Sequence, residues 1–496
     1  MNTNRRDFLK DTAFAAFAAG LAGCATSKAA GGGVTGSLVG FRTAPMDRIR
    51  VGFIGVGERG MAALHRVMLF KGVEVTAVGD IRTEAAEEGV AFLKKWKLPG
   101  SDAVKAYCGK ADSWKALCED PNVDILYILT PALLHTEMII RGLECGKHVL
   151  IEVPGCQTIE QGWRIVRAAE KAQRHCYMLE NRCFREPETL AYTMCKSGVL
   201  GELAYAEAAY IHPLCWRNLE DHFRNRALKQ SLRMDHNWNT YPTHPLGPIC
   251  RYFDINCGDR MTTLVSMSTD DFTHPAYAKA NFPPDAWQNK VAYRGADMNT
   301  TLIRTAKGRT IELKFCLSTP RPYTRINQVC GTKGIFQGEP FEIYVAEKPG
   351  GPYGWDNEPQ YMNEKEREAM RLKYMHPLWK TFGETVKKAG SNDKASKFFA
   401  GHGGVDYIMD LSWIYALRNG LPMPQNVYDL ATWSSIVDLT RLSVQSGSSP
   451  VEIPDFTCGA WSKLVPQPLK DIAMADVGFD PAAFVANVNA WAETKI

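Results

Sequence analysis

Apolar runs of strand length alternate with amphipathic stretches through the first part of the chain. The apolar runs cover residues 49–54, 73–78, 123–129, 149–153 and 176–181. Apolar residues recur at helical spacing over residues 61–70, 82–96, 111–118, 135–144 and 161–173. This alternation is typical of an α/β domain built on a doubly wound parallel sheet. We therefore predict a first domain over residues 47–181.

The second half of the chain shows a different pattern. Strand-like runs over residues 203–211, 264–268, 299–305, 310–317 and 324–331 follow one another without intervening helices. Helical patterns return over residues 405–420 and 429–443, and the remaining residues to Ile496 look irregular. Strands in direct succession favour an antiparallel sheet. We predict a second, α+β domain over residues 182–496 with a mostly antiparallel sheet, C-terminal helices and a tail.

The first 46 residues look like a targeting segment and a linker rather than part of a folded domain. Residues 1–24 contain Arg5-Arg6, a short apolar run and the lipobox-like sequence Leu21-Ala22-Gly23-Cys24. They resemble a twin-arginine export signal that ends at a lipidated cysteine. Residues 25–46 are rich in Ala, Gly and Ser and predict a flexible tether. We expect a periplasmic or outer-membrane-anchored lipoprotein, and the alternative is a disordered cytoplasmic leader.

Composition narrows the classes of partner. The chain has 496 residues, 45% of them apolar, and a formal net charge of only +4, without a basic block that would suggest nucleic acid. After the N-terminus no apolar run is long enough to span a bilayer, so contact with a membrane is expected only through the lipid anchor. The 14 cysteines form no CxxC pair or zinc-type cluster, which predicts buried free thiols and no metal site. An exposed sheet face in the second domain would make a homo-oligomer possible.

The strongest motif joins the first two predicted strands. Gly55, Gly57 and Gly60 form a GxGxxG between a strand and a helix, and Asp80 ends the next strand. In a Rossmann fold these glycines allow a tight turn, a close approach to a pyrophosphate and close helix packing, while the acid binds a ribose diol. The motif predicts NAD rather than NADP, although Arg82 weakens that preference. The alternative is a glycine turn in an ordinary βαβ unit.

Other candidate residues surround the expected ligand crevice. Ligands of such sheets lie beyond the carboxyl ends of the strands, which places residues 55–60, Asp80, residues 130–135 and Glu152 around one crevice. Glu152 would face the nicotinamide end of the crevice or cap a helix.

The segment 212–248 is crowded with His, Trp, Arg, Asn and Tyr and has little periodicity, as functional segments often do. Tyr241 and His244 lie on one face if Pro242 begins a helical turn, and this pair could transfer protons. The alternative for this pair is an ordinary loop, because His and Tyr are common near prolines. For Tyr210 and Tyr323 the alternative is packing in the core. His402 could line a pocket or serve as a turn residue.

In combination these segments resemble a known family. The first half is similar to the Gfo/Idh/MocA group of NAD(P)-dependent, sugar-handling enzymes, most of which have Glu-Lys-Pro where this chain has Glu152-Val153-Pro154. The lost lysine, usually an acid/base, argues against a simple sugar dehydrogenase. One branch is resembled in particular, the NAD-dependent α-N-acetylgalactosaminidases of glycoside hydrolase family 109. The segments that carry this resemblance are 152–154, 178–181, 209–212, 241–248, 319–323 and 401–407.

The resemblance implies an unusual retaining hydrolysis of terminal α-N-acetylgalactosamine. The sugar is oxidised at C3 by NAD⁺, loses its C2 proton and its C1 substituent, adds water and is reduced again. Carried over to this chain, the cofactor residues are Arg59, Gly60, Asp80, Ala132, Leu133, Leu134, His135, Glu152, Val153, Asn181 and Arg233. The sugar residues are Tyr210, Arg233, Tyr241, Pro242, Thr243, His244 and Tyr323. Tyr210, Tyr241 and His244 are the candidates for proton transfer, with Glu152 as a further catalytic candidate.

The same resemblance leaves some points open. The family often has tryptophan where Ala132 stands, so the wall beside the nicotinamide is expected to differ here. We expect an exported glycosidase that acts on α-N-acetylgalactosaminide glycans. The alternatives are an NAD-dependent sugar dehydrogenase of the same fold and a non-catalytic sugar-binding lipoprotein.

Overall fold

The computed structural model describes residues 37–463, except 69, 96–99, 220–235, 353–355, 381–382 and 384–400. Several predictions therefore fall outside the described residues. These are the export signal over residues 1–24, the site residue Arg233, and the tail beyond residue 463.

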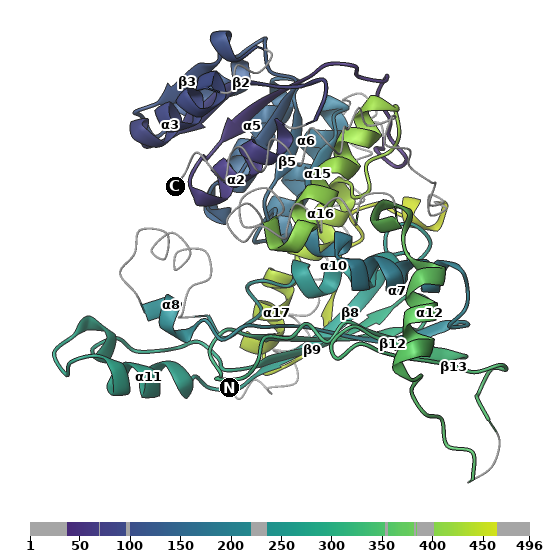
Figure 1. Cartoon of the computed structure of the whole chain (residues 1–496). Helices are drawn as coiled ribbons and strands as arrows, with labels where there is room; N and C mark the ends of the chain where they lie inside the picture. Colours follow the sequence, from purple (N-terminus) through teal and green to yellow (C-terminus); the bar gives the residue numbers. More distant parts are fainter. Residues whose placement is uncertain are drawn as a thin grey trace, which may run out of the picture.

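The first domain is built on a six-stranded parallel sheet (Figure 1). Its order is β3-β2-β1-β4-β5-β6, with β1 over Ile49–Ile54, β2 over Val73–Asp80, β3 over Lys105–Cys108, β4 over Ile125–Ile128, β5 over His148–Ile151 and β6 over Cys176–Met178. The helices are α2 (Glu58–Val67), α3 (Thr83–Lys95), α4 (Ser113–Glu119), α5 (His135–Glu144) and α6 (Ile159–Ala172). The predicted Rossmann-type fold is confirmed. The strand order reverses between β1 and β4, where such sheets bind their ligands.

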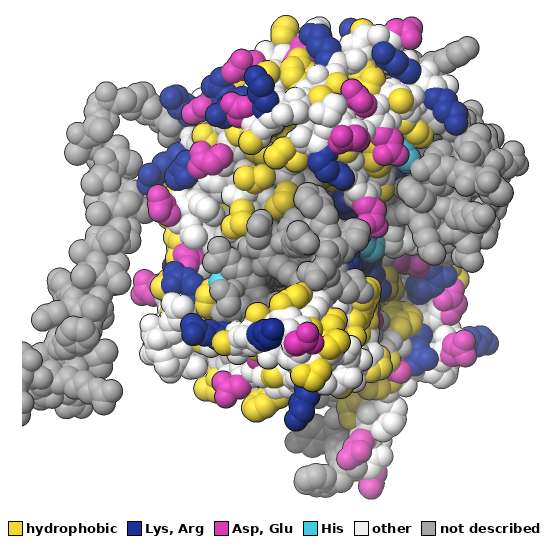
Figure 2. Space-filling view, turned by 90° about the vertical axis from the view of Figure 1, so that its left-hand side faces the viewer, with side chains coloured by type: hydrophobic (Ala, Val, Ile, Leu, Met, Phe, Trp, Pro, Cys, Tyr) yellow, Lys and Arg dark blue, Asp and Glu magenta, His cyan; other side chains and the backbone are white. Residues whose placement is uncertain are grey.

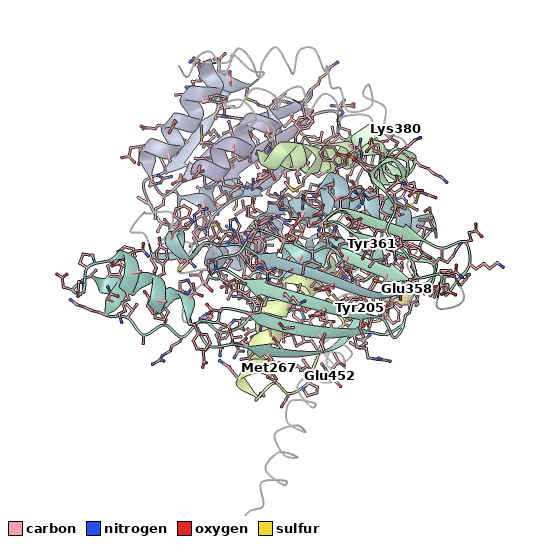
Figure 3. The ribbon with its side chains drawn as sticks, turned by 60° about the horizontal axis from the view of Figure 1, so that its bottom comes forward. Tyr205, Met267, Glu358, Tyr361, Lys380 and Glu452 are labelled. Atoms are coloured by element: carbon pink, nitrogen blue, oxygen red, sulfur yellow. The ribbon has the colours of Figure 1, made fainter. Side chains whose placement is uncertain are left out.

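The second domain is built on an eight-stranded sheet, shown in Figure 3 with Tyr205 and Met267 labelled. Its order is β13-β12-β11-β7-β10-β9-β8-β14. The strands are β7 (Leu203–Ile211), β8 (Met261–Ser268), β9 (Asn299–Thr305), β10 (Thr310–Cys316), β11 (Gln328–Gly331), β12 (Gly334–Gln337), β13 (Glu342–Val345) and β14 (Val451–Glu452). Among the strand pairs of this sheet in the described residues, only β7–β10 is parallel. The mostly antiparallel sheet is therefore confirmed.

Two element boundaries differ from the sequence prediction. Strand β11 begins at Gln328 rather than Thr324, because Ile326 and Asn327 have φ angles of 62° and 52° and cannot continue a strand. The single helix expected over residues 429–443 is two helices, α16 (Val427–Ser434) and α17 (Ile436–Gln445), which meet at Ser435. The other helices of this domain are α7 (Glu186–Lys196), α8 (Cys215–Leu219), α10 (Thr243–Tyr252), α11 (Thr273–Asn281) and α12 (Glu364–Tyr374).

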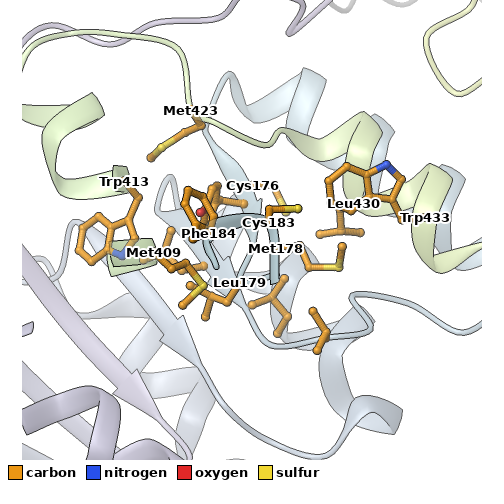
Figure 4. Packing of buried hydrophobic residues seen from close by; sticks show 14 of the residues in the cluster. Cys176, Met178, Leu179, Cys183, Phe184, Met409, Trp413, Met423, Leu430 and Trp433 are labelled. Carbon is orange, nitrogen blue, oxygen red and sulfur yellow. The ribbon is translucent and has the colours of Figure 1, made fainter. Parts of the chain in front are cut away.

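The C-terminal helices complete the core of the first domain. Helix α15 (Gly401–Arg418) packs on α2, and α16 packs on α6, so both lie between the two sheets in Figure 1. Figure 4 shows side chains of α15 and α16, among them Trp413 and Trp433, around Met178 and Phe184. Asp410 of α15 accepts hydrogen bonds from the buried Arg66 at 2.9 Å and from the Tyr127 hydroxyl at 2.8 Å. The two domains therefore share one continuous core.

The predicted flexible tether needs a correction at its C-terminal end. Leu38 is only 4% exposed, and its backbone N–H donates to the Tyr428 hydroxyl at 3.0 Å. The Phe41 ring meets the edge of His175 at 4.8 Å between ring centres. Apolar side chains return to the sequence at Leu38, and the contacts of Leu38 and Phe41 hold this segment against α16 and against the first domain at His175. A tether can therefore extend no further than residue 36.

Two surface properties bear on partners. On the face that Figure 2 shows, Lys and Arg side chains are interspersed with Asp and Glu, without a large patch of one sign. No helix in the described ranges is both long enough and apolar enough to cross a bilayer.

Candidate active site

A cavity of about 1280 Å³ lies between the two domains. On one side it is lined by the carboxyl ends of β1, β2, β4 and β5, as parallel sheets require of their ligand sites. On the other side it is lined by residues of the second sheet and of the segments beside it. The predicted site residues that line it are Gly55, Gly57, Arg59, Gly60, Asp80, Ala132, Leu134, Glu152, Val153, Asn181, Tyr210, Tyr241, His244 and Tyr323.

The glycine turn has the shape that a dinucleotide needs. Gly55 has a φ angle of +89°, and a Cβ on Gly60 would lie 2.0 Å from the Gly55 carbonyl oxygen. Gly57 is the N-cap of α2 and has no side chain to cap the helix, and the N-terminus of a helix favours an anion. Asp80 holds the turn in place, because its carboxylate accepts a hydrogen bond from the Val56 N–H at 2.9 Å. These residues fit a bound NAD pyrophosphate and ribose.

A buried carboxylate organises the wall beside this turn. Asp406 of α15 is fully buried and accepts hydrogen bonds from three cavity-lining residues, Arg59, Asn181 (2.6 Å) and His402 (3.0 Å). Burial alone would raise the pKa of Asp406, but the charges of Arg59 and Arg66 hold it well below its usual range. Sequence analysis missed Asp406, although it noticed the surrounding segment 401–407.

Glu152 does not stand free in this wall. Its carboxylate accepts a hydrogen bond from Arg59 Nε at 2.6 Å, so Arg59 bridges Glu152 and Asp406. The hydrogen bond and the charge of Arg59 hold this carboxylate in place on the nucleotide side of the cavity. Glu152 therefore fits a cofactor-positioning role better than that of a general base.

His244 of the second domain and Glu180 at the end of the first domain form a hydrogen-bonded dyad at the cavity. Helix α10 begins at Thr243, as expected if Pro242 starts a helical turn, and this puts Tyr241 and His244 side by side. The Nδ1 atom of His244 lies 2.9 Å from Oε2 of Glu180, while its Nε2 lies 3.4 Å from the Tyr241 hydroxyl. The Glu180 side chain is completely buried. A carboxylate on Nδ1 fixes the tautomer and leaves Nε2 as the proton acceptor.

The ionisation of this dyad follows from its burial. Burial lowers the pKa of His244 to about 4, against the attraction of the Glu180 carboxylate. Burial also opposes ionisation of Glu180, but its attraction to His244 and the hydrogen bonds that it accepts from His244 and from the Arg182 N–H lower the pKa of Glu180. His244 is thus a neutral base near neutral pH. Glu180 was part of a segment noticed in the sequence but was not predicted as a site residue.

Two tyrosines stand beside the dyad. The Tyr210 ring centre lies 5.0 Å from that of Tyr241 and 5.6 Å from that of His244. Burial raises the pKa of Tyr210 to about 12 and that of Tyr241 well above its ordinary value. Both hydroxyls therefore carry their protons at neutral pH and can donate hydrogen bonds. Tyr323 completes the cluster, with its ring centre 6.4 Å from that of Tyr210.

Four predicted residues do not line the cavity. Leu133 points to solvent at 41% exposure, whereas Pro242 and Thr243 are buried in the start of α10. His135 is buried behind the wall, where its ring nitrogens lie 2.8 Å from the carbonyl oxygens of Pro154 and Thr130. His135 thus braces two cavity-lining turns instead of facing the cofactor.

Two family models match consecutive parts of the chain. The model described as the oxidoreductase family, NAD-binding Rossmann fold, matches residues 49–180. The model described as glycosyl hydrolase 109, C-terminal domain, matches residues 184–463, more than half of the chain. The chain belongs to glycosyl hydrolase family 109. This family 109 protein is therefore a glycoside hydrolase with an NAD-binding Rossmann domain, and the expected family and cofactor are confirmed.

Relatives and solved structures agree with this assignment. An α-N-acetylgalactosaminidase from Bacteroides fragilis is 39% identical over 430 residues, which cover 86% of this chain and 96% of that protein. A glycosyl hydrolase family 109 protein from a Shewanella species is 38% identical and covers 93% of this chain and 98% of that protein.

The solved structures show the fold alone. An NAD-binding oxidoreductase from Klebsiella pneumoniae has a TM-score of 0.59 at 19% identity and covers 82% of this chain and 99% of that chain. A levoglucosan dehydrogenase in complex with NADH and levoglucosan has a TM-score of 0.56, again at 19% identity, and covers 82% of this chain and all of that chain.

Proposed function

We propose that this family 109 protein hydrolyses terminal α-N-acetylgalactosaminides with NAD as a recycled cofactor. The observation that carries the proposal is the neutral His244 base, with Tyr241 and Tyr210 beside it, in the same cavity as the glycine turn. The 39% identity to an α-N-acetylgalactosaminidase supports the choice of sugar.

The cavity does not suit the usual chemistry of glycosidases. Most glycosidases use two carboxyl groups that flank the scissile bond. Among the described residues, the carboxylates that line the cavity are Glu58, Asp80 and Glu152, all from the first domain. Asp80 holds the glycine turn and Glu152 is paired with Arg59. Bound NAD would supply what these side chains lack, an acceptor for a hydride from the sugar that later gives the hydride back.

The side chains of the second domain perform the proton transfers in this proposal. His244 Nε2 accepts the proton of a sugar hydroxyl as that carbon is oxidised, and Glu180 stabilises the imidazolium that forms. Oxidation at C3 makes the neighbouring C2 proton acidic. A tyrosine hydroxyl gives its own proton to the departing C1 oxygen and takes the C2 proton in its place. Tyr210 fits this role better than Tyr241, since Tyr241 is already directed at His244.

The second candidate function is sugar oxidation without hydrolysis, the reaction type of the dehydrogenases that share this fold. Val153 argues against it, because its apolar side chain lines the cavity where the resemblance places a lysine acid/base. The two functions differ in whether reduced cofactor accumulates.

A chromogenic α-N-acetylgalactosaminide tests the proposal. We expect the chromophore to be released without net formation of NADH, and protein stripped of NAD to be inactive until NAD is restored. Hydrolysis in deuterated water should also place deuterium at C2 of the released sugar. Cleavage by the stripped protein, or a product without deuterium at C2, would rule out the oxidation–elimination route.

We also propose that residues 1–24 direct export by the twin-arginine route and that Cys24 becomes lipidated. The sequence Arg5-Arg6 and the lipobox-like run before Cys24 support this proposal. Replacement of both arginines by lysine should retain the protein in the cytoplasm, and Cys24→Ala should release it from membranes. Unchanged fractionation of both variants would contradict the proposal.

A further inference from the structure

A cluster of charged side chains borders the cavity on the side of the second domain. It consists of the guanidinium groups of Arg182, Arg185 and Arg325 and the carboxylates of Glu188 and Glu339. Arg185 donates to Glu188 at 3.0 Å and to Glu339 at 2.8 Å, so one guanidinium binds both carboxylates. The second oxygen of Glu339 accepts the backbone N–H of Arg325 at 2.7 Å. These five groups therefore hold one more cation than anions, and the nearby Glu180 carboxylate, which accepts the Arg182 backbone N–H, is paired with His244.

The two remaining guanidinium groups form no salt bridge within the described part of the chain. Arg325 is 1% exposed, and its Nη1 and Nη2 atoms make no hydrogen bond there. Only its Nε donates, to the hydroxyl of Tyr323. Arg182 has a buried Nε without a hydrogen-bond partner among the described residues. A buried cation without a counter-ion costs several kcal/mol, and such a cost is typical of a binding site.

The excess charge faces the cavity. Arg182, Arg185 and Tyr323 all line it, and Tyr323 joins Arg325 to it through their hydrogen bond. The described carboxylates in the cavity wall belong to the opposite, first domain. An anionic group bound beside Arg182 would therefore meet a net positive charge rather than a like charge.

We propose that this cluster recognises a single negative charge on the glycan, a carboxylate or a sulfate ester next to the N-acetylgalactosamine that is cleaved. This inference rests on the proposed function for its sugar. Both groups carry at least two anionic oxygen atoms on one centre, which a guanidinium can bind through two hydrogen bonds. One negative charge would balance the cluster. A dianion would leave an excess of negative charge in a buried site.

Binding measured by calorimetry tests this inference without turnover. The full-length protein with NAD is titrated with N-acetylgalactosamine, with its 6-sulfate, and with a disaccharide of N-acetylgalactosamine and glucuronic acid. We expect one of the anionic sugars to bind at least about tenfold more tightly than the neutral sugar, as a charged hydrogen-bonded contact should. The tighter of the two identifies the sulfate or the carboxylate as the group recognised.

Variants locate the effect. Arg182→Met should remove the preference for the anionic sugar and leave binding of the neutral sugar within about twofold, whereas Arg182→Lys should keep part of the preference. Arg441→Met, in α17 and outside the cavity lining, removes an arginine that is likewise paired with a carboxylate, Asp438. It is the matched control and should bind all three sugars like the parent protein. Equal binding of neutral and anionic sugars, or a preference that survives Arg182→Met, would overturn the inference. Anion-selective binding by a protein that hydrolyses no α-N-acetylgalactosaminide would instead refute the proposed function alone.

Discussion

Single residues decide which groups of this site can react. His244 and Glu180 lie 64 positions apart in the sequence, yet they form one hydrogen-bonded dyad at the cavity wall. The buried carboxylate gives His244 a defined tautomer, and the glycines of the turn keep side chains away from the expected phosphate. Each of these two features can be tested by a single substitution of its own.

Glu180→Gln should slow turnover while cofactor binding persists. The glutamine retains a hydrogen-bond acceptor for His244 but removes the charge that stabilises the imidazolium, so kcat should fall on the order of a hundredfold or more. Glu180 raises the pKa of His244 relative to burial alone. The acidic limb of the profile of kcat/KM against pH should therefore move to lower pH.

The control for this variant is Glu170→Gln, at a half-buried carboxylate of α6 that binds Tyr428 far from the dyad. It should keep the parent kcat and pH profile. An unshifted profile for Glu180→Gln would show that Glu180 only supports the fold.

Gly57→Ala and Gly60→Ala should separate cofactor binding from folding. A Cβ on Gly57 meets nothing closer than Arg82 at 3.6 Å, whereas a Cβ on Gly60 would overlap the Gly55 carbonyl. Gly57→Ala should keep the Tm of the NAD-free protein and lose at least about tenfold in NAD affinity, because the methyl group would stand where the pyrophosphate approaches. Gly60→Ala should lower both the Tm of the NAD-free protein and its affinity for NAD. Full NAD affinity in Gly57→Ala would contradict the predicted phosphate position.

Strands and helices could be predicted from the sequence where the local pattern of residues determines them. The strands of the first sheet, the glycine turn and the start of α10 follow from apolar runs, a spaced motif and a proline. The roles of Glu180 and Asp406 were not predictable, because buried charges on a strand end and on a helix resemble solvated residues until their partners are known. The break at Ser435 was also hidden, since the residues of α16 and α17 are apolar or small on both sides of it.

Helix α15 should control the cofactor side of the cavity through Asp406. Asp406→Asn would leave Arg59 and Arg66 without their shared anion and weaken the bonds to Asn181 and His402. Breaking a buried ion pair costs roughly 3–5 kcal/mol, so the Tm should fall together with NAD affinity. Thermal unfolding measures the Tm, and titration with NAD measures the affinity for the cofactor.

Glu368→Gln is the control for this prediction, because its pair with Arg371 lies on the exposed side of α12. An exposed pair contributes at most about 1 kcal/mol. Equal NAD affinity in Asp406→Asn and Glu368→Gln would refute the role given to α15.

At the scale of the whole molecule, buried neutral histidines set the response to acid. Burial lowers the pKa of His148 and His376 to about 3 and that of His175 to about 4. Unfolded histidine takes up its proton near pH 6.5, so the unfolded state binds more protons below that pH. The folded protein should therefore be most stable above about pH 6.5 and lose stability as the pH falls towards 4.

Urea unfolding between pH 8 and pH 4.5 checks this dependence. We expect little change from pH 8 to pH 7, and then a fall to which each buried histidine contributes up to about 1.4 kcal/mol per pH unit. His148→Asn keeps an acceptor for the His175 N–H, now bonded at 2.9 Å, and should reduce the slope by about one such contribution. A slope unchanged by this variant would contradict the assignment.

The placement of α15 also has a consequence for biosynthesis. Residues 401–418 leave the ribosome long after the six strands of the first sheet, yet they carry the acid that anchors Arg59 at the nucleotide turn. A nascent chain that stops before this helix would expose the apolar faces of α2 and β6. The wall of the cavity beside the glycine turn would also lack Asp406. Acquisition of the dinucleotide should therefore be a post-translational event, and a ribosome-bound fragment ending near residue 380 should not retain it.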